Sequence, residues 1–313
     1  MRPLVVTPGM GIGPEVTLRA LQVAPRPVVL IGRATALHAA NRGLGLPLQG
    51  VEHEAQAAPG AIPLLDADDR AEPAEVAALR MAVAGCLTGR FAGLVTGPIH
   101  KKRLAERGFA FKGHTDFLGH ILGAEREVMA FVGGELRVAL VTTHIPLQAV
   151  SGALRAADIE RVVQVAHDAL VRDLGLSQPH ILLCGCNPHA GEEGLLGDEE
   201  LRVIGPAAHR LRAQGLRVTG PISAETAFLE ARAGRGDLIV AMYHDQGLAP
   251  LKAVDFGRSV NWTLGLPILR TSVDHGTADA LVGTGKADPA SMIAALKLAG
   301  EIAQRRADAA SNC

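Results

Sequence analysis

Three histidines each follow a short apolar run, and histidine is the residue that most often binds transition metals in proteins. His144 comes after the run 138–142, His189 after 181–183 and His244 after 238–241. A histidine is usually a surface or ordinary core residue, and the chain has 12. Three neutral imidazoles with one open coordination position would nevertheless suit zinc or a similar divalent ion. The neighbouring Asp245 could orient the His244 ring or add a ligand.

A second group of polar residues lies in the sequence Lys-Gly-His-Thr-Asp-Phe at 112–117. Such a cluster beside a glycine can bind an anion and position a proton carrier, for which His114 is the candidate. The alternative is a helix cap, in which Thr115 or Asp116 accepts hydrogen bonds from free backbone amides. The local pattern leaves both interpretations open.

A third group of polar residues is spread over the stretch 252–270. It contains Lys252, Asp255, Arg258, Asn261 and Arg270. Lysine, asparagine and arginine near glycines could bind a phosphate or a carboxylate, whereas the alternative is a solvated loop with ordinary surface charges. Apolar residues at 264, 266, 268 and 269 indicate that part of the stretch is buried. Burial would make an unpaired charge there costly.

A glycine-rich segment, residues 8–15, opens a predicted helix after the first apolar run. Glycines allow a close backbone approach to a ligand, and a helix N-terminus favours an anion. The spacing is not the GxGxxG fingerprint of dinucleotide-binding folds. A tight turn between strand and helix, with Pro14 in the first helical turn, explains the segment equally well.

The elements that must position these residues alternate along the chain. The apolar runs 4–6, 28–31, 94–95, 138–142, 181–183 and 238–241 predict buried strands, and the stretches 73–88, 156–172, 199–213 and 289–304 predict amphipathic helices. This alternation indicates an α/β fold with a mostly parallel sheet, and 313 residues suffice for two domains. The candidate residues follow the carboxyl ends of strands, which is where open α/β sheets bind ligands.

The composition excludes several classes of partner. Basic and acidic residues number 31 and 32 and form no block, so we expect no nucleic acid and no membrane partner. No apolar stretch approaches about 18 residues, and the N-terminus lacks a signal-peptide pattern, so we expect a cytoplasmic protein. Cys184 and Cys186 lack a second pair at zinc-site spacing, which favours ordinary buried or half-buried thiols.

Five longer motifs occur in order along the whole chain. They are Thr96-Gly97-Pro98 with Lys101, Gly113-His114-Thr115, Asn187-Pro188-His189-Ala190-Gly191-Glu192, Ala241-Met242-Tyr243-His244-Asp245-Gln246-Gly247 and Arg270-Thr271-Ser272-Val273-Asp274-His275-Gly276-Thr277. Together they resemble the 4-hydroxythreonine-4-phosphate dehydrogenase family of vitamin B6 biosynthesis, which shares the wider isocitrate and isopropylmalate dehydrogenase fold. The resemblance implies two α/β/α domains with mostly parallel sheets and an active-site cleft between them. We place these domains at residues 1–118 plus 279–313 and at 119–278.

The resemblance also implies specific chemistry for the candidate residues. A divalent metal (zinc, magnesium or cobalt) would be held by His144, His189 and His244. The substrate and its phosphate would be bound by His114, Thr115, Lys252, Asn261 and Arg270. The family oxidises the 3-hydroxyl of 4-phosphohydroxy-L-threonine with NAD, and the β-keto acid then decarboxylates to 3-amino-2-oxopropyl phosphate.

Several points stay open at this level. The general base could be His114, Asp245 or Lys252, NADP could replace NAD, and no residue is assigned to the nucleotide. The resemblance further implies a homodimer in which the partner subunit contributes to the active site.

Two segments depart from the family pattern. The glycine loop is two residues shorter and lacks an aspartate, and Glu225 stands where the family has an aspartate.

Three alternatives to this substrate assignment follow. One is a paralogue acting on a four-carbon sugar-acid phosphate, such as threonate or erythronate 4-phosphate. A relative acting on an unphosphorylated diol would not need the phosphate-binding residues. A non-catalytic metal- or nucleotide-binding homologue is supported only by the altered glycine loop.

Overall fold

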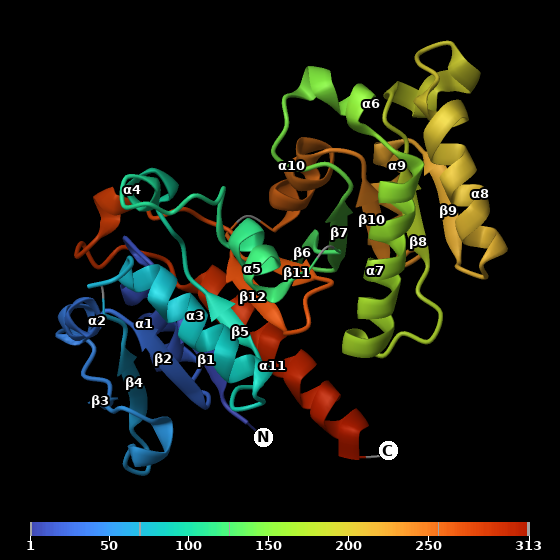
Figure 1. The fold of residues 1–313 in the computed structure, drawn as a ribbon. Coiled ribbons are helices and arrows are strands. Elements are labelled where there is room, and N and C mark those ends of the chain that lie inside the picture. Colours follow the sequence, from blue (N-terminus) through green and yellow to red (C-terminus); the bar gives the residue numbers. More distant parts are fainter. Residues whose placement is uncertain (1, 69, 125, 256, 312–313) are drawn as a thin grey trace. The chain divides into compact units, whose positions relative to one another are not determined.

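The chain folds into two compact units in the computed structural model, which describes residues 2–68, 70–124, 126–255 and 257–311. The first unit comprises residues 1–124 with 266–313, and the second comprises residues 125–265. The units therefore change over at residues 124/125 and 265/266, whereas we expected changes at 118/119 and 278/279. Figure 1 shows the elements of both units.

The first unit is built on a fully parallel sheet with the strand order β3-β4-β2-β1-β5-β12. Its strands are β1 (Leu4–Thr7), β2 (Val28–Gly32), β3 (Leu48–Gly50), β4 (Ile62–Asp66), β5 (Leu94–Thr96) and β12 (Arg270–Val273). Its helices are α1 (Gly13–Val23), α2 (Ala34–Asn41), α3 (Ala74–Leu87), α4 (Lys101–Ala105), α5 (His114–Leu122) and α11 (Ala290–Ser311).

Apolar residues of the first sheet are buried on both faces, as expected for parallel strands. Val5, Val29 and Leu94 form one core cluster with the apolar side of α3, and Figure 1 shows α3 lying along these strands. Successive strand residues point to opposite faces, so the equally buried Val6 faces the other way. On β12, Thr271 donates a hydrogen bond of 3.0 Å to the Ala295 carbonyl of α11.

The second unit has a mixed sheet with the order β11-β6-β7-β10-β8-β9. Its strands are β6 (Val128–Gly133), β7 (Leu136–Leu140), β8 (Ile181–Cys184), β9 (Val218–Ile222), β10 (Leu238–Ala241) and β11 (Val260–Leu264). Its helices include α6 (Val150–Ala153), α7 (Ala156–Leu174), α8 (Gly205–Ala213), α9 (Ala224–Arg232) and α10 (His244–Val254). Strand β6 is antiparallel to both of its neighbours, whereas β7, β10, β8 and β9 are parallel.

The predicted fold class is confirmed, since both units combine helices with mostly parallel strands. The predicted strands at 4–6, 28–31, 94–95, 181–183 and 238–241 all lie within observed strands. Strand β7 ends at Leu140, so residues 141–144 already belong to the loop that follows it. Within the described part of the chain, no helix is both long and apolar enough to cross a membrane.

The turn between β1 and α1 requires a glycine at position 13, and this requirement can be tested. A Cβ on Gly13 would lie 1.9 Å from the Pro8 carbonyl oxygen, whereas a Cβ on Gly43 would meet nothing within 4 Å. We expect Gly13→Ala to lower the free energy of unfolding by about 1–3 kcal/mol, because the backbone must shift to admit the methyl group. Gly43→Ala should leave it unchanged or slightly higher. Equal urea midpoints for the two variants would contradict this account.

Candidate functional site

The three histidines of interest follow three neighbouring parallel strands of the second unit. Strand β10 pairs with β7 on one side and with β8 on the other. Carboxyl ends of adjacent parallel strands meet at the same edge of a sheet. His144, His244 and His189 come four, three and five residues after β7, β10 and β8, respectively.

Hydrogen bonds link the segments that directly follow β7, β10 and β8, which we call the strand exits. Thr142 donates to the Met242 carbonyl through its amide at 3.1 Å and its hydroxyl at 2.7 Å. Gln246 accepts a hydrogen bond of 2.7 Å from the Met242 amide and donates one of 2.7 Å to the Gly185 carbonyl. The loops carrying His144 and His244 are therefore held against each other, and Gln246 links the latter to the exit of β8.

His144 and His244 have the spacing of two ligands on one metal ion. Their ring centroids are 5.6 Å apart. Two imidazoles on a tetrahedral zinc, with Zn–N distances near 2 Å, would place their centroids about 5 Å apart. The Nδ1 atom of His244 lies 2.7 Å from a carboxylate oxygen of Asp245, which directs Nε2 toward a ligand. Donor type and spacing therefore fit a divalent cation at this pair.

His189 does not form a three-residue metal-binding group with that pair. The described residues contain no group of three histidine, cysteine, aspartate or glutamate side chains that could hold a metal. The exposed His189 lies on the turn 188–194, where His189, Ala190, Glu192 and Glu193 have φ angles of 51°, 54°, 42° and 58°. Left-handed backbone costs about 1–2 kcal/mol per non-glycine residue. Such strain persists only where surrounding contacts impose it, often at functional sites.

Two buried carboxylates impose the conformation at the start of this turn. Glu199 and Glu200 are 8% and 4% exposed. The Asn187 side-chain amide donates to Glu199 at 2.6 Å and to Glu200 at 2.9 Å, and the Ser151 hydroxyl donates to Glu199. These hydrogen bonds, first from Ser151 and then from Asn187, lower the pKa of Glu199. Our sequence reasoning missed both acids, because nothing in their local pattern separates them from an exposed charged turn.

His114 lies in a strongly cationic part of the first unit. It is the first residue of α5 and is partly buried. Burial, followed by the charges of Arg270 and Lys101, lowers the pKa of His114 to about 3. A Cβ on Gly113 would lie 3.4 Å from Cε of Lys101, so the lysine side chain passes directly beside this helix start. A neutral imidazole near two cations is suited to binding an anion.

Arg270 is 2% exposed and lies on β12. Its Nη2 donates a hydrogen bond of 2.8 Å to the Thr96 hydroxyl, which in turn donates to Ser272 at 2.9 Å. Burial lowers the pKa of Arg270 to about 9, so the guanidinium stays mostly charged at neutral pH. Thr96, the last residue of β5 and the first of the Thr-Gly-Pro motif, therefore supports the buried arginine.

Helix α5 begins after Gly113 without a side-chain cap, so the helix-cap interpretation of residues 112–117 holds only in that Asp116 bonds an amide just before the helix. This residue accepts a hydrogen bond of 2.9 Å from the Lys112 amide. The partly buried Thr115 occupies the second position of α5. This hydrogen bond of Asp116 and anion binding by His114 are compatible, since they use different side chains.

The remaining predicted residues lie in the second unit. Lys252 is on α10, eight residues after His244, which is about 12 Å along a helix axis. Asn261 is on β11, paired with Phe131 of β6. Both side chains are partly buried. Asp245 is 86% exposed and contacts His244, so its position favours orienting that ring.

The glycine loop uses its backbone amides within the protein. The amides of Met10, Ile12 and Gly13 donate to the carbonyls of Pro98, Thr277 and Met10 at 2.8, 2.9 and 3.0 Å. These hydrogen bonds support the tight-turn interpretation, because they engage three of the loop's amides within the protein.

The cysteines fit the interpretation as ordinary thiols. Burial raises the pKa of Cys86 and Cys184 to about 12 and that of Cys186 to about 11. These three are free thiols in the structure, and Cys313 lies outside the described residues.

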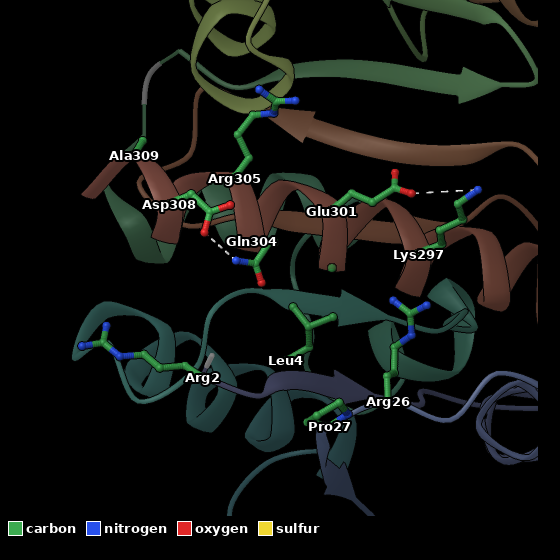
Figure 2. A pocket seen from close by; sticks show the side chains of 11 residues that line it. Arg2, Leu4, Arg26, Pro27, Lys297, Glu301, Gln304, Arg305, Asp308 and Ala309 are labelled. Carbon is green, nitrogen blue, oxygen red and sulfur yellow. Dashed lines mark hydrogen bonds and ion pairs between the residues drawn. The ribbon is translucent and has the colours of Figure 1, made fainter. Parts of the chain in front are cut away.

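A hollow in the first unit lies apart from the predicted residues. It is lined by Arg2, Leu4, Arg26, Pro27, Lys297, Gly300, Glu301, Gln304, Arg305, Asp308 and Ala309, and Figure 2 shows it between α11 and the start of β1. Gln304 donates to Asp308 at 2.6 Å, and Lys297 lies 3.9 Å from Glu301. No residue predicted for the chemistry lines this hollow.

Comparison with known proteins gives consistent matches over nearly the whole chain. The family described as "Pyridoxal phosphate biosynthetic protein PdxA" matches residues 24–299. A 4-hydroxythreonine-4-phosphate dehydrogenase of Azoarcus sp. (strain BH72) is 46% identical and covers 97% of each chain.

Solved structures give the same pattern. The crystal structure of 4-hydroxythreonine-4-phosphate dehydrogenase from Klebsiella pneumoniae matches with a TM-score of 0.86 at 38% identity, covering 97% of this chain and 100% of that one. A terephthalate 1,2-cis-dihydrodiol dehydrogenase from Burkholderia xenovorans LB400 matches with a TM-score of 0.66 at 29% identity, covering 96% and 98%.

The lowered pKa of His114 predicts acid sensitivity. An unfolded histidine binds a proton near pH 6.5, whereas folded His114 resists protonation down to about pH 3. The contribution of neutral His114 to the free energy of unfolding is therefore fully present above pH 6.5 and is lost as the pH falls toward 3. Urea unfolding of the wild type should lose more free energy between pH 8 and pH 4 than unfolding of His114→Gln. Identical pH profiles would contradict the placement of this ring beside Arg270 and Lys101.

Proposed function

The chain belongs to the PdxA family of pyridoxal phosphate biosynthetic proteins, and we propose that it oxidises the 3-hydroxyl of 4-phosphohydroxy-L-threonine with NAD. The matches to known proteins confirm the family expected from the sequence motifs, and with it the expectation that the chain is an oxidoreductase. The geometric observation that carries the proposal is the His144–His244 pair, spaced for a shared metal at the carboxyl edge of a sheet.

We propose that His144, His189 and His244 hold a divalent cation (zinc, magnesium or cobalt), with Asp245 orienting the His244 ring. The cation would supply a Lewis acid that lowers the pKa of the substrate hydroxyl and stabilises negative charge on the same oxygen during decarboxylation. The described residues of one chain gather two of these histidines. This supports a homodimer in which the partner subunit completes the site.

We propose that the phosphate is bound by His114, Thr115, Lys252, Asn261 and Arg270. The arrangement in the first unit supports this, because a neutral His114 beside two cations can donate a hydrogen bond to a phosphate oxygen. A bound phosphate would also raise the pKa of His114 by partly neutralising its cationic neighbours.

The reaction follows in two balanced steps. A base would take the hydroxyl proton, and NAD (or NADP), when bound, would supply the acceptor for the hydride from C3, so that the product would be the β-keto acid. That acid then loses carbon dioxide, and a proton added to the resulting carbanion gives 3-amino-2-oxopropyl phosphate. His114 and Lys252 remain candidates for the base, since Asp245 is engaged with His244.

A second candidate is oxidation of a four-carbon sugar-acid phosphate, because the same phosphate-binding residues would serve it. An unphosphorylated diol is disfavoured, since the cationic surroundings of His114 favour an anionic group on the substrate. The resemblance to the dihydrodiol dehydrogenase therefore supports the fold more than the substrate.

Steady-state assays of NADH formation test this proposal. With a divalent metal present, we expect turnover of 4-phosphohydroxy-L-threonine with kcat/KM at least tenfold above that for threonate or erythronate 4-phosphate. Turnover of the sugar acids alone would make the second candidate correct, and no NAD reduction with any of the three would indicate a non-catalytic homologue.

His189→Ala tests the proposed metal-binding role of His189 in the same assay. It should lose activity while its unfolding midpoint without metal stays close to that of the wild type, since the His189 side chain is exposed. Full activity in this variant would remove His189 from the proposed metal site.

A further inference from the structure

Glu200 connects the buried interior of the second unit to the strained turn that carries His189. One carboxylate oxygen, Oε1, accepts the backbone amides of Cys186 and Asn187 at 2.6 and 2.9 Å. The other oxygen, Oε2, accepts the Asn187 side-chain amide at 2.9 Å. Both oxygens are therefore engaged with the segment immediately before His189.

Glycines pack tightly around this carboxylate and its asparagine. A Cβ on Gly185 would lie 2.8 Å from Oε1 of Glu200, and a Cβ on Gly191 would lie 2.6 Å from Oε2. A Cβ on Gly197 would lie 2.4 Å from Nδ2 of Asn187. Gly185 and Gly191 therefore border the Glu200 carboxylate closely, and Gly197 borders the Asn187 amide that donates to it.

The same segment is linked to the His244 loop. Gly185 directly precedes Cys186 and Asn187, whose amides donate to Glu200. The Gly185 carbonyl accepts the hydrogen bond from Gln246. Gln246 in turn accepts the amide of Met242, two residues before His244. A shift of the 185–187 segment would therefore disturb the contact between the exits of β8 and β10 as well as the His189 turn.

We propose that Glu200 is a positioning residue for metal binding: it holds the 185–187 segment and thereby sets where the turn 188–194 presents His189. This inference rests on the proposed role of His189 as a metal ligand. It holds whether His189 serves its own subunit or the partner. Residues that orient metal ligands typically change metal affinity by about 10- to 100-fold when they are removed.

The two-oxygen arrangement predicts a graded response to substitution. Glu200→Gln keeps an oxygen that can accept both backbone amides, and it loses only the bond from the Asn187 side chain. Glu200→Ala removes all three hydrogen bonds and leaves two buried amides without their acceptor. Glu193→Gln is the matched control, because Glu193 is an exposed acid on the same turn.

The experiment is a titration of the metal-free full-length protein with cobalt(II), followed by its visible absorption spectrum. We expect Glu200→Ala to bind cobalt at least tenfold more weakly than the wild type and with an altered spectrum. Glu200→Gln should stay within about threefold of the wild type, and Glu193→Gln should match it. Unfolding midpoints of the metal-free proteins are measured in parallel, since a purely structural role would lower the midpoint alone.

Wild-type affinity and spectrum in a folded Glu200→Ala variant would overturn the inference while leaving the proposed function intact. Failure of the wild type to bind cobalt would overturn both. If Glu200→Ala does not fold, Asn187→Ala replaces it: this change removes the side-chain bonds to both Glu199 and Glu200, and so more than Glu200→Gln does, while it keeps both backbone amides. A several-fold loss of cobalt affinity in Asn187→Ala would then support the inference, and unchanged affinity would overturn it.

Discussion

The candidate metal site depends on one constraint, which is that adjacent parallel strands end at the same edge of a sheet. Strands β7, β10 and β8 come from distant parts of the chain, yet β10 pairs with both of the others. Any residue placed a few positions after each strand is thereby brought to a common region. The hydrogen bonds of Thr142 and Gln246 refine that placement by tying neighbouring strand exits together.

The loops at this edge differ in how their conformations are maintained. His244 begins α10 and contacts Asp245, so helix geometry and a carboxylate define its orientation. His189 lies on a left-handed turn that is unfavourable for its own residues. Buried carboxylates at 199 and 200 offset that cost through charge-assisted hydrogen bonds, which are stronger than neutral ones. Stability of the surrounding unit and the position of His189 are thus coupled.

Much of the fold was predictable from local patterns, whereas the fine structure of the site was not. Apolar runs bounded by glycine and proline marked strands because buried parallel strands need no alternation. The roles of Glu199 and Glu200 depend on burial created by residues far away in sequence, so their charge alone suggested nothing. The lowered pKa of His114 likewise depends on burial and on the charge of Arg270, a residue of β12, which lies far away in sequence and pairs with β5.

The glycine loop also shows that a local pattern alone cannot choose between two interpretations. Its composition allowed anion binding or a tight turn, and the distant acceptors at Pro98 and Thr277 favour the turn. The motif order, in contrast, identified the family correctly, because several long motifs in sequence carry more information than any one local pattern.

The most direct test of the metal site is anomalous diffraction from crystals grown with cobalt, recorded at the cobalt absorption edge. The account predicts a peak about 2 Å from a ring nitrogen of both His144 and His244, with an imidazole of His189, from the same or the partner subunit, as a third ligand. A cobalt peak elsewhere with none at the His144–His244 pair would contradict it.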